Sequence, residues 1–273
     1  MKANFAPGLH VALGQAANVS AYDRWVGRWS RLFVPAMISA AEVAPGYRVL
    51  DISTGTGEAA LKVLPTVGVS GVVIGADIAP AMLVGARDRL KDPAFFPVAA
   101  DGQALPFKNG GFDAVICQLG LQFFPDPARG LTEFCRVLRP GRCAAVCVIS
   151  AQERAPMWGI LADVLSRFVP EQRDLLHLSF ALADANHLEH MFATAGFREV
   201  RVERMQREDT VGSFDEYWEP IETGVGSQPQ IYVALPEAHR RAVRDEVKAR
   251  LSPFGSNGRL TMSVEMLVGI GRA

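Results

Sequence analysis

Four short stretches with polar residues or glycines, each directly after an apolar run, have the residue types needed to bind a small polar ligand. They are VLDISTGTG from position 49, VIGADIAPAML from 73, PVAADGQALPF from 97 and VICQLGLQFF from 115. In the first, Gly55 and Gly57 permit a tight turn and place no side chain in the way of a ligand. A helix that begins after them directs partial positive charge toward that ligand. We therefore expect a ligand to approach the backbone closely at this turn.

Side chains in the second and third stretches indicate what the ligand is. Asp77 follows the glycines by about twenty residues, where a carboxylate in a dinucleotide-binding fold accepts both hydroxyls of a ribose. Ile78 and Met82 can wall a flat base. Asp101 and Gln103 can hydrogen-bond the exocyclic amine of an adenine. Each feature has a structural alternative, namely a tight turn, an acid at a helix N-terminus or a turn residue, but their succession favours a nucleoside site.

The elements that must position these residues are apolar strands alternating with helices. Strands are expected over 48–51, 72–77, 95–99, 113–118 and 142–149, and helices over 58–64, 80–90 and 127–138. The strands are continuously apolar, as strands covered on both faces are. This alternation predicts a doubly wound, mostly parallel sheet with right-handed crossovers. In such a sheet, ligands bind outside the carboxyl ends of the strands, where the four stretches fall.

Composition excludes several other classes of protein. The 273 residues are 49% hydrophobic and carry a net charge of −1, so no overall field favours nucleic acid. No apolar run reaches the roughly 18 residues of a membrane span, and residues 1–17 lack a signal-peptide pattern, so we expect a cytoplasmic protein without stable membrane insertion. No metal site is predicted, because none of the cysteines forms a C-x-x-C pair. These cysteines are Cys117, Cys135, Cys143 and Cys147.

The successive stretches VLDISTGTG, GADIAPAML, AADGQALPF, FDAVICQLGLQFFPDP and RVLRPGR resemble the motifs of class I S-adenosylmethionine-dependent methyltransferases. Within that class they are similar to the group that includes the ubiquinone and menaquinone biosynthesis C-methyltransferases. The resemblance covers about residues 20–150, and LEHMFATAGFREVRVER extends it into a sixth strand. It implies an α/β fold with a Rossmann-like seven-stranded sheet, whose last strand, around Thr261–Gly269, runs antiparallel between the fifth and sixth.

The resemblance also implies a role for each stretch. The turn from Asp51 to Gly57 would cradle the methionine part of the cofactor, and Asp77 would hold its ribose. YDRWVGRWSR resembles the family's N-terminal cover, which places Trp29 nearby and lets Arg28 pair with the cofactor carboxylate. The implied cofactor-binding residues are Tyr22, Arg28, Asp51, Ser53, Thr54, Gly55, Gly57, Asp77, Ile78, Met82, Asp101, Gly102, Gln103, Gln118 and Leu119.

One position departs from the family's pattern. The family often has three glycines in this turn, and Ser53 occupies the place of the first. A small side chain can be accommodated there if its φ is negative, and its hydroxyl group is then available to bond the ligand.

We predict one domain over 1–273, with two independent domains as the alternative. Its parts are N-terminal cover helices over 20–44, a cofactor-binding core over 45–150, lid helices and the sixth strand over 151–260, and the last strand over 261–273. A helix over 156–180 has an apolar stripe that either packs into the core or, with Trp158, Phe168 and Phe180, caps an apolar substrate; a membrane-surface role is disfavoured by its few basic residues.

The predicted function is methyl transfer from S-adenosylmethionine to a small apolar or aromatic acceptor, on carbon or oxygen, with S-adenosylhomocysteine as product. An NAD(P)-dependent oxidoreductase is an alternative, because GTGEAA fits G-x-G-x-x-A. A cofactor-binding protein without methyl transfer is another. The spacing singles out no catalytic base and makes no prediction of oligomeric state. The candidate bases are His177, His187, His190, Tyr217 and Tyr232.

Overall fold

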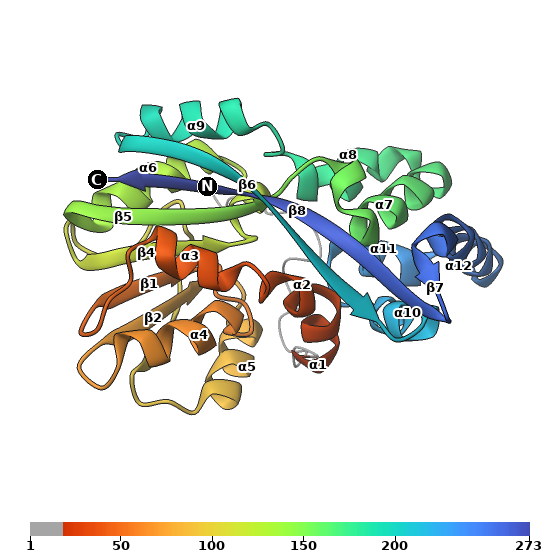
Figure 1. Ribbon diagram of the computed structural model, residues 1–273, viewed down its shortest axis with the longest axis horizontal. Helices are drawn as coiled ribbons and strands as arrows, with labels where there is room; N and C mark the ends of the chain where they lie inside the picture. The colour runs from red at the N-terminus through yellow and green to blue at the C-terminus, as the bar shows by residue number, and fades with distance from the viewer. Residues whose placement is uncertain (1–18) are drawn as a thin grey trace.

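The computed structural model describes residues 19–273, so the first 17 residues, with their predicted lack of a signal peptide, lie outside the described part. Within that part, one sheet has the strand order β3-β2-β1-β4-β5-β8-β6, with a short β7 paired to β8 (Figure 1). The first five strands are parallel, and the order reverses between β1 and β4. Their bounds are β1 Arg48–Ile52, β2 Val72–Asp77, β3 Phe95–Ala99, β4 Phe112–Gln118 and β5 Leu138–Ile149.

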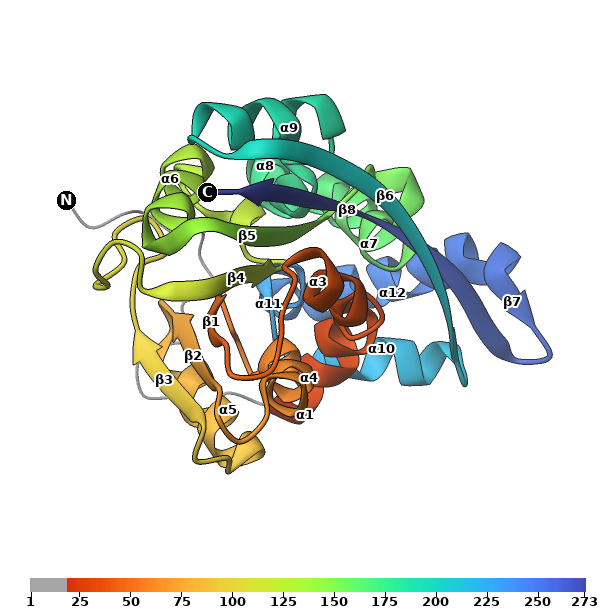
Figure 2. The ribbon, with the colours of Figure 1, turned by 60° about the vertical axis from the view of Figure 1, so that its left-hand side comes forward.

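The last long strand confirms the expected topology. Strand β8, Arg259–Arg272, lies antiparallel between β5 and β6, which is Arg198–Val211. It is longer than the predicted 261–269 because its first residues pair with β7, Gly255–Ser256, in a hairpin and its last residues pair with β5. Beyond the parallel strands, β6 and β8 continue together as a curved ribbon with β7 at its far end (Figure 2).

Helices cover both faces of the sheet, as its continuously apolar strands require. On one face lie α3 Val34–Ala40, α4 Glu58–Val67 and α5 Pro80–Leu90; on the other lie α6 Pro127–Val137 and α9 Ala185–Thr194 (Figure 1). Alternate strand residues feed the two layers, so that Val49 packs with the first group and Leu50 with the second. Helix α6 begins where Asp126 accepts a hydrogen bond from Arg129 N, with Pro127 in its first turn.

A group of helices packs along the far part of β6 and β8 (Figure 1). It comprises α7 Pro156–Phe168, α8 Arg173–His177, α10 Phe214–Glu222, α11 Ser227–Ala234 and α12 Glu237–Leu251. The single helix predicted over 156–180 is wrong: Pro170 ends it, because proline has no N–H and its ring clashes with the preceding turn. Met157, Leu161 and Leu165 on α7 are fully buried, which supports the core-packing role of the stripe.

The segment before α3 is short and irregular. It runs through α1 Val19–Tyr22, a π-helical turn η1 over Asp23–Gly27, and α2 Arg28–Ser30. Such a π-turn shifts the side chains that follow it relative to a regular helix. Among residues 19–273, no helix combines the length and apolarity needed to cross a membrane.

We predict that Gly269→Ala destabilises the fold. A Cβ at this position of β8 would stand 2.7 Å from a ring carbon of the buried Phe192 on α9. Overpacking of this kind costs about 1–3 kcal/mol. Phe192→Leu in the same chain should recover part of the loss, because it removes the clashing ring edge. Urea unfolding of both single variants and the double variant measures this; strictly additive losses would show that the two residues do not oppose each other.

Candidate functional site

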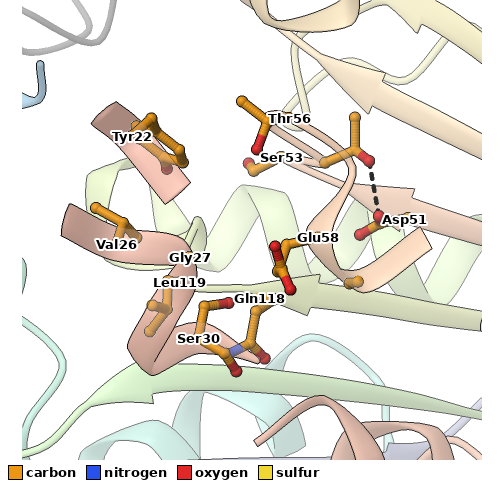
Figure 3. Close-up of a pocket in the computed structure, with 13 residues that line it drawn as sticks. Tyr22, Val26, Gly27, Ser30, Asp51, Ser53, Thr56, Glu58, Gln118 and Leu119 are labelled. Carbon is orange, nitrogen blue, oxygen red and sulfur yellow. Dashed lines mark hydrogen bonds between the residues drawn. The ribbon is translucent and has the colours of Figure 1, made fainter. Parts of the chain in front are cut away.

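A pocket lies at the carboxyl ends of β1 and β4, where the strand order reverses. It opens to solvent, and its empty space, with the open solvent at its mouth included, is about 360 Å³. Figure 3 shows Tyr22 and Val26 of the N-terminal segment facing the β1–α4 turn across it. Its lining residues come from three segments: Tyr22, Val26, Gly27 and Ser30; Asp51, Ser53, Thr54, Gly55, Thr56, Glu58 and Ala59; and Gln118 and Leu119.

The β1–α4 turn is built from left-handed backbone. The φ angles of Ser53, Gly55 and Gly57 are +55°, +54° and +80°. Ser53 thus does not meet the condition of a negative φ, and a non-glycine residue held in this region costs about 1–2 kcal/mol. Its side chain packs against Gly120, where an added Cβ would stand only 2.4 Å from that of Ser53. The strain is stored directly beneath the pocket.

Asp77 holds this turn in place. One carboxylate oxygen, Oδ2, accepts a hydrogen bond from Gly55 N at 2.8 Å, and Oδ1 accepts one from Ala79 N at 2.9 Å. Burial raises the pKa of Asp77, while both backbone N–H groups favour its charged form. The carboxylate remains partly exposed. It thus ties the ends of β1 and β2 together, although Asp77 itself is not among the residues that line the pocket.

Asp51 is the buried acid of the pocket. It is 0% exposed, and its Oδ2 accepts a hydrogen bond from Thr54 Oγ1 at 2.7 Å. No group in residues 19–273 forms a hydrogen bond with its Oδ1. Burial raises the pKa of Asp51 to about 7; the hydrogen bond from Thr54 opposes this rise and the negative charge of Asp77 adds to it. A buried carboxylate oxygen in this state suits a cationic ligand group.

The residues at the end of β4 form the third wall of the pocket. Gln118 Nε2 donates to Ser30 O at 3.3 Å, which links the strand to the N-terminal segment, and its Oε1 has no partner in the described part of the chain. Leu119 has a φ of +56°, and its N–H donates to Cys147 O. Both residues therefore line the pocket as expected, and the Oε1 atom of Gln118 is an acceptor without a hydrogen-bond donor.

Charged residues that the sequence analysis missed hold the N-terminal segment over the turn. Asp23 accepts a hydrogen bond from Thr56 Oγ1 at 3.0 Å and pairs with Arg89 at 3.2 Å. Arg89 also pairs with Glu58 at 2.7 Å, and Arg31 lies 3.3 Å from the same carboxylate. Glu58 directly follows the glycine turn, and this position was the one signal in the sequence that could have pointed to it. Asp23, Arg31 and Arg89 lie far apart in the sequence, so their spacing predicted none of these contacts.

Tyr22 is carried by this segment to the turn. Its ring and hydroxyl lie 3.9 Å from the position that a Cβ on Gly55 would occupy. Burial raises the pKa of Tyr22, and the charges of Asp77 and Asp23 raise it further. Tyr22 is therefore a neutral cover over Gly55.

Arg28 does not line the pocket. Its guanidinium donates to Asp209 Oδ2 at 2.6 Å, to Glu216 Oε1 at 2.9 Å and to Thr210 O at 3.0 Å. These partners belong to β6 and α10, so Arg28 fastens the N-terminal segment to the helical group. The structure gives no support to its pairing with a cofactor carboxylate. Trp29 is 1% exposed and packs in the core.

The edge expected to hold an adenine is partly as predicted. Asp77 pairs in register with Ala99, and Ala100 N donates to Asp77 O, so the ends of β2 and β3, and with them Asp101, lie together. Ile78 and Met82 are partly exposed at this edge. Asp101 Oδ1 accepts from both Gln103 N and Gln103 Nε2.

Gln103 and Gly102, by contrast, are packed against the interior of the protein. Gln103 is 5% exposed, and its Oε1 accepts a hydrogen bond from Asp126 N at 2.8 Å. A Cβ on Gly102 would stand 2.4 Å from the Phe124 ring. Their expected reading of an adenine edge therefore has a structural alternative: they join the third stretch to the start of α6.

None of the five candidate bases lines the pocket. His177 Nε2 lies 3.0 Å from Ser166 Oγ, and burial lowers its pKa. Tyr217 donates to Met157 O at 2.6 Å, and burial raises its pKa, as it does that of Tyr232. His187 and His190 are exposed on α9. None of these five side chains is therefore a base at the pocket wall.

The class I methyltransferase fold is defined by this strand order, by the antiparallel strand β8 between β5 and β6, and by the glycine turn at the point where the order reverses. Comparison with known proteins agrees: residues 27–210 match the model of the ubiE/COQ5 methyltransferase family. The chain belongs to this family, and the resemblance stated from the sequence is confirmed.

Individual relatives show how far this similarity extends. The ubiquinone/menaquinone biosynthesis C-methyltransferase UbiE of Laribacter hongkongensis is 41% identical over 121 residues, 44% of this chain and 50% of that protein. The demethylmenaquinone methyltransferase of Lactococcus lactis subsp. lactis is 32% identical over 174 residues, 58% of this chain and 69% of that protein. The chain spans about half the length of the first curated relatives that it matches.

A solved structure supports the fold. The phosphoethanolamine N-methyltransferase 2 of Haemonchus contortus superposes with a TM-score of 0.61 at 16% identity, covering 100% of this chain and 61% of that one. At this identity the likeness concerns the fold alone.

We predict that Ser53→Gly leaves the protein as stable or more stable. Glycine removes the left-handed strain of about 1–2 kcal/mol and adds about 0.5–1 kcal/mol of unfolded-state entropy. Lys91→Gly, at a φ of +47° at the end of α5, is the matched control away from the pocket. Chemical unfolding compares them. A clear loss for Ser53→Gly beside a gain for Lys91→Gly would show that the serine side chain, and not only its backbone, holds the turn.

Proposed function

We propose that this protein transfers a methyl group from S-adenosylmethionine to a small, quinone-type aromatic acceptor and releases S-adenosylhomocysteine. The observation that carries the proposal is the pocket at the strand reversal, where a left-handed turn held by Asp77 lies beside a buried Asp51 oxygen without a partner. Membership of the ubiE/COQ5 methyltransferase family supports the reaction class. The names of the curated relatives support the acceptor class.

The pocket residues fit the cofactor in chemistry. The methionine part carries an ammonium group, and Asp51 Oδ1 is a buried acceptor at the pocket wall. The turn from Ser53 to Gly57 exposes backbone where side chains are absent, and a helix N-terminus follows it. Asp77 keeps a lone pair on each oxygen for ribose hydroxyls. Ile78 and Met82 would flank the adenine.

The cofactor, when bound, supplies both the electrophilic methyl group and the leaving group. The chain's own residues then need to orient the two reactants and keep water out. Tyr22 and Val26 cover the turn from the N-terminal side, and ion pairs of Asp23 and Arg89 hold that cover closed.

Two other functions use the same pocket. A nicotinamide oxidoreductase is disfavoured by the family match. A cofactor-binding protein without methyl transfer shares every residue named above, since a fold does not determine chemistry. Transfer of labelled methyl groups to candidate quinols separates it from the proposal. A small-molecule acceptor, a cytoplasmic location and independence from nucleic acid stay predictions.

We predict that Gly55→Val abolishes S-adenosylhomocysteine binding. Its side chain would project toward Tyr22 into the space of the ligand, 3.9 Å from that ring. Gly68→Val is the matched control: its φ is +66°, and nothing lies within 4 Å of an added Cβ. Valine is strained at both positions because both have a positive φ, and only the first variant blocks the pocket. Isothermal titration calorimetry with S-adenosylhomocysteine and NADH compares them with the unchanged chain.

The two ligands make the outcome decisive. The proposal expects S-adenosylhomocysteine to bind the unchanged chain and Gly68→Val alike, and NADH to bind neither. Normal S-adenosylhomocysteine affinity in Gly55→Val, or binding of NADH alone, contradicts it.

We also predict that S-adenosylhomocysteine affinity rises with pH through about 7, the raised pKa of Asp51. Below this pH the carboxyl group is mostly protonated and cannot pair with the ligand ammonium; above it the charged form is already present, so affinity levels off. Binding below pH 7 should release a proton, seen as a dependence of the calorimetric enthalpy on buffer ionisation. Asp51→Asn should remove both effects, whereas Asp88→Asn, at an exposed position on α5, should keep them. An affinity without pH dependence would show that Asp51 does not meet the ligand's charge.

A further inference from the structure

Arg89 lies directly behind the wall of the pocket, near the end of α5, and does not line the pocket itself. Its Nη1 donates to Asp23 Oδ1 at 3.2 Å and to Thr56 O at 3.4 Å, and its Nη2 donates to Glu58 Oε2 at 2.7 Å. Thr56 and Glu58 line the pocket (Figure 3). Asp23 belongs to Tyr22–Gly27, the part of the N-terminal segment that covers the pocket and is here called the cover. One guanidinium therefore joins the cover, the β1–α4 turn and the start of α4.

Asp23 and Glu58 are two acids held close together at this wall. A Cβ on Gly27 would stand 3.2 Å from Asp23 Oδ1 and 3.3 Å from Glu58 Oε2, so both carboxylates approach the same point of the cover. Their side chains are only 20% and 10% exposed, so water and salt screen their mutual repulsion poorly. Without a cation between them, this repulsion would push the cover away from α4.

The electrostatics of Asp23 reflect this balance. Burial raises the pKa of Asp23, the charge of Arg89 and the hydrogen bond from Thr56 oppose that rise, and the charge of Glu58 adds to it. Arg89 is thus the cation that favours the charged form of Asp23 most, although Glu58 lies beside it.

Arg31 supplies a weaker pair at the same place. Its Nε lies 3.3 Å from Glu58 Oε1 and donates to Gly27 O at 3.0 Å, and its side chain is 45% exposed. The Arg89 side chain is 22% exposed and bonds to both acids. A guanidinium suits this position, because its N–H donors are fixed in a planar fork and its charge is permanent.

The position of the cover affects any ligand in the pocket. Tyr22, Val26 and Gly27 form one side of the pocket, and the Tyr22 ring lies 3.9 Å from the place of a Cβ on Gly55. A cofactor seated on the turn would therefore lie against these cover residues. If the cover separated from the turn, those contacts would be lost and the cofactor would leave sooner.

We propose that Arg89 is a positioning residue for cofactor binding: by neutralising Asp23 and Glu58 together, it keeps the cover against the turn and prolongs the time for which the cofactor stays bound. This inference rests on the proposed function. Arg89 is not among the cofactor-binding residues that the family resemblance implies. It acts through the cover, makes no contact with the cofactor and adds no chemical step.

The test uses Arg89→Met, which removes the charge and keeps a long side chain. Hydrogen–deuterium exchange of the chain without ligand should become faster over 22–30 and stay unchanged in the buried strand β4. The dissociation rate of S-adenosylhomocysteine, followed by stopped-flow tryptophan fluorescence, should rise about tenfold, the scale of one lost hydrogen bond to a charged group. Arg87→Met, on the same helix with a side chain that is 63% exposed, is the matched control and should change neither quantity.

A double variant separates charge neutralisation from simple support of the fold. Asp23→Asn removes one of the two negative charges and keeps an oxygen that can accept the hydrogen bond from Thr56. Added to Arg89→Met, it should recover part of the lost residence time, because a neutral side chain then faces Glu58. A merely structural role for Arg89 predicts no recovery.

The outcomes separate the inference from the proposed function. Unchanged exchange over 22–30, an unchanged dissociation rate in Arg89→Met, or no recovery in the double variant overturns the role of Arg89 and leaves the proposed function standing. If the unchanged chain does not bind S-adenosylhomocysteine, the proposed function fails and the inference falls with it. Arg89→Gln, which also removes the charge, gives the same test if Arg89→Met does not fold.

Discussion

The whole site depends on the hydrogen bond from Gly55 N to Asp77 Oδ2. It crosses from the end of β1 to the end of β2 and, together with the bond from Thr54 N to Ala76 O, holds the left-handed turn in place. The acid therefore has a structural task at the strand ends, beside the ribose-binding task proposed for it. A parallel sheet supplies the frame for this, because its strand ends meet at one edge and its order reverses next to β1.

The N-terminal segment is the second organising feature. Asp23 and Arg31 join it to α4 and α5 on the cofactor side, while Arg28 joins it to β6 and α10 on the other. A single short segment is thus held at both ends by partly buried ion pairs, which are less screened by salt than exposed ones. Figures 1 and 2 both show it between the parallel core and the outer helices. Arg28 is thus a direct link between β6 and α10 and the cover of the pocket.

Much of the fold could be predicted from local sequence because continuous apolar runs such as that of β4 have few alternatives once helices alternate with them. The antiparallel place of β8 came from family resemblance, not from its residues. What failed depended on tertiary partners. The φ of Ser53 is set by Gly120 packed against it, and the role of Arg28 is set by acids about 180 residues later in the chain. The end of the helix before Pro170 is the exception, because the proline in the sequence was enough to predict it.

Two acceptor atoms without partners line the pocket, and they differ in charge. One is a carboxylate oxygen of Asp51 beside the turn, and the other is the neutral amide oxygen of Gln118 at the end of β4. A buried charge is tolerated only where a counter-charge arrives, as an amino-acid ammonium does. A neutral amide oxygen needs only a hydrogen-bond donor, so it can meet an uncharged group of a ligand without drawing in a counter-charge.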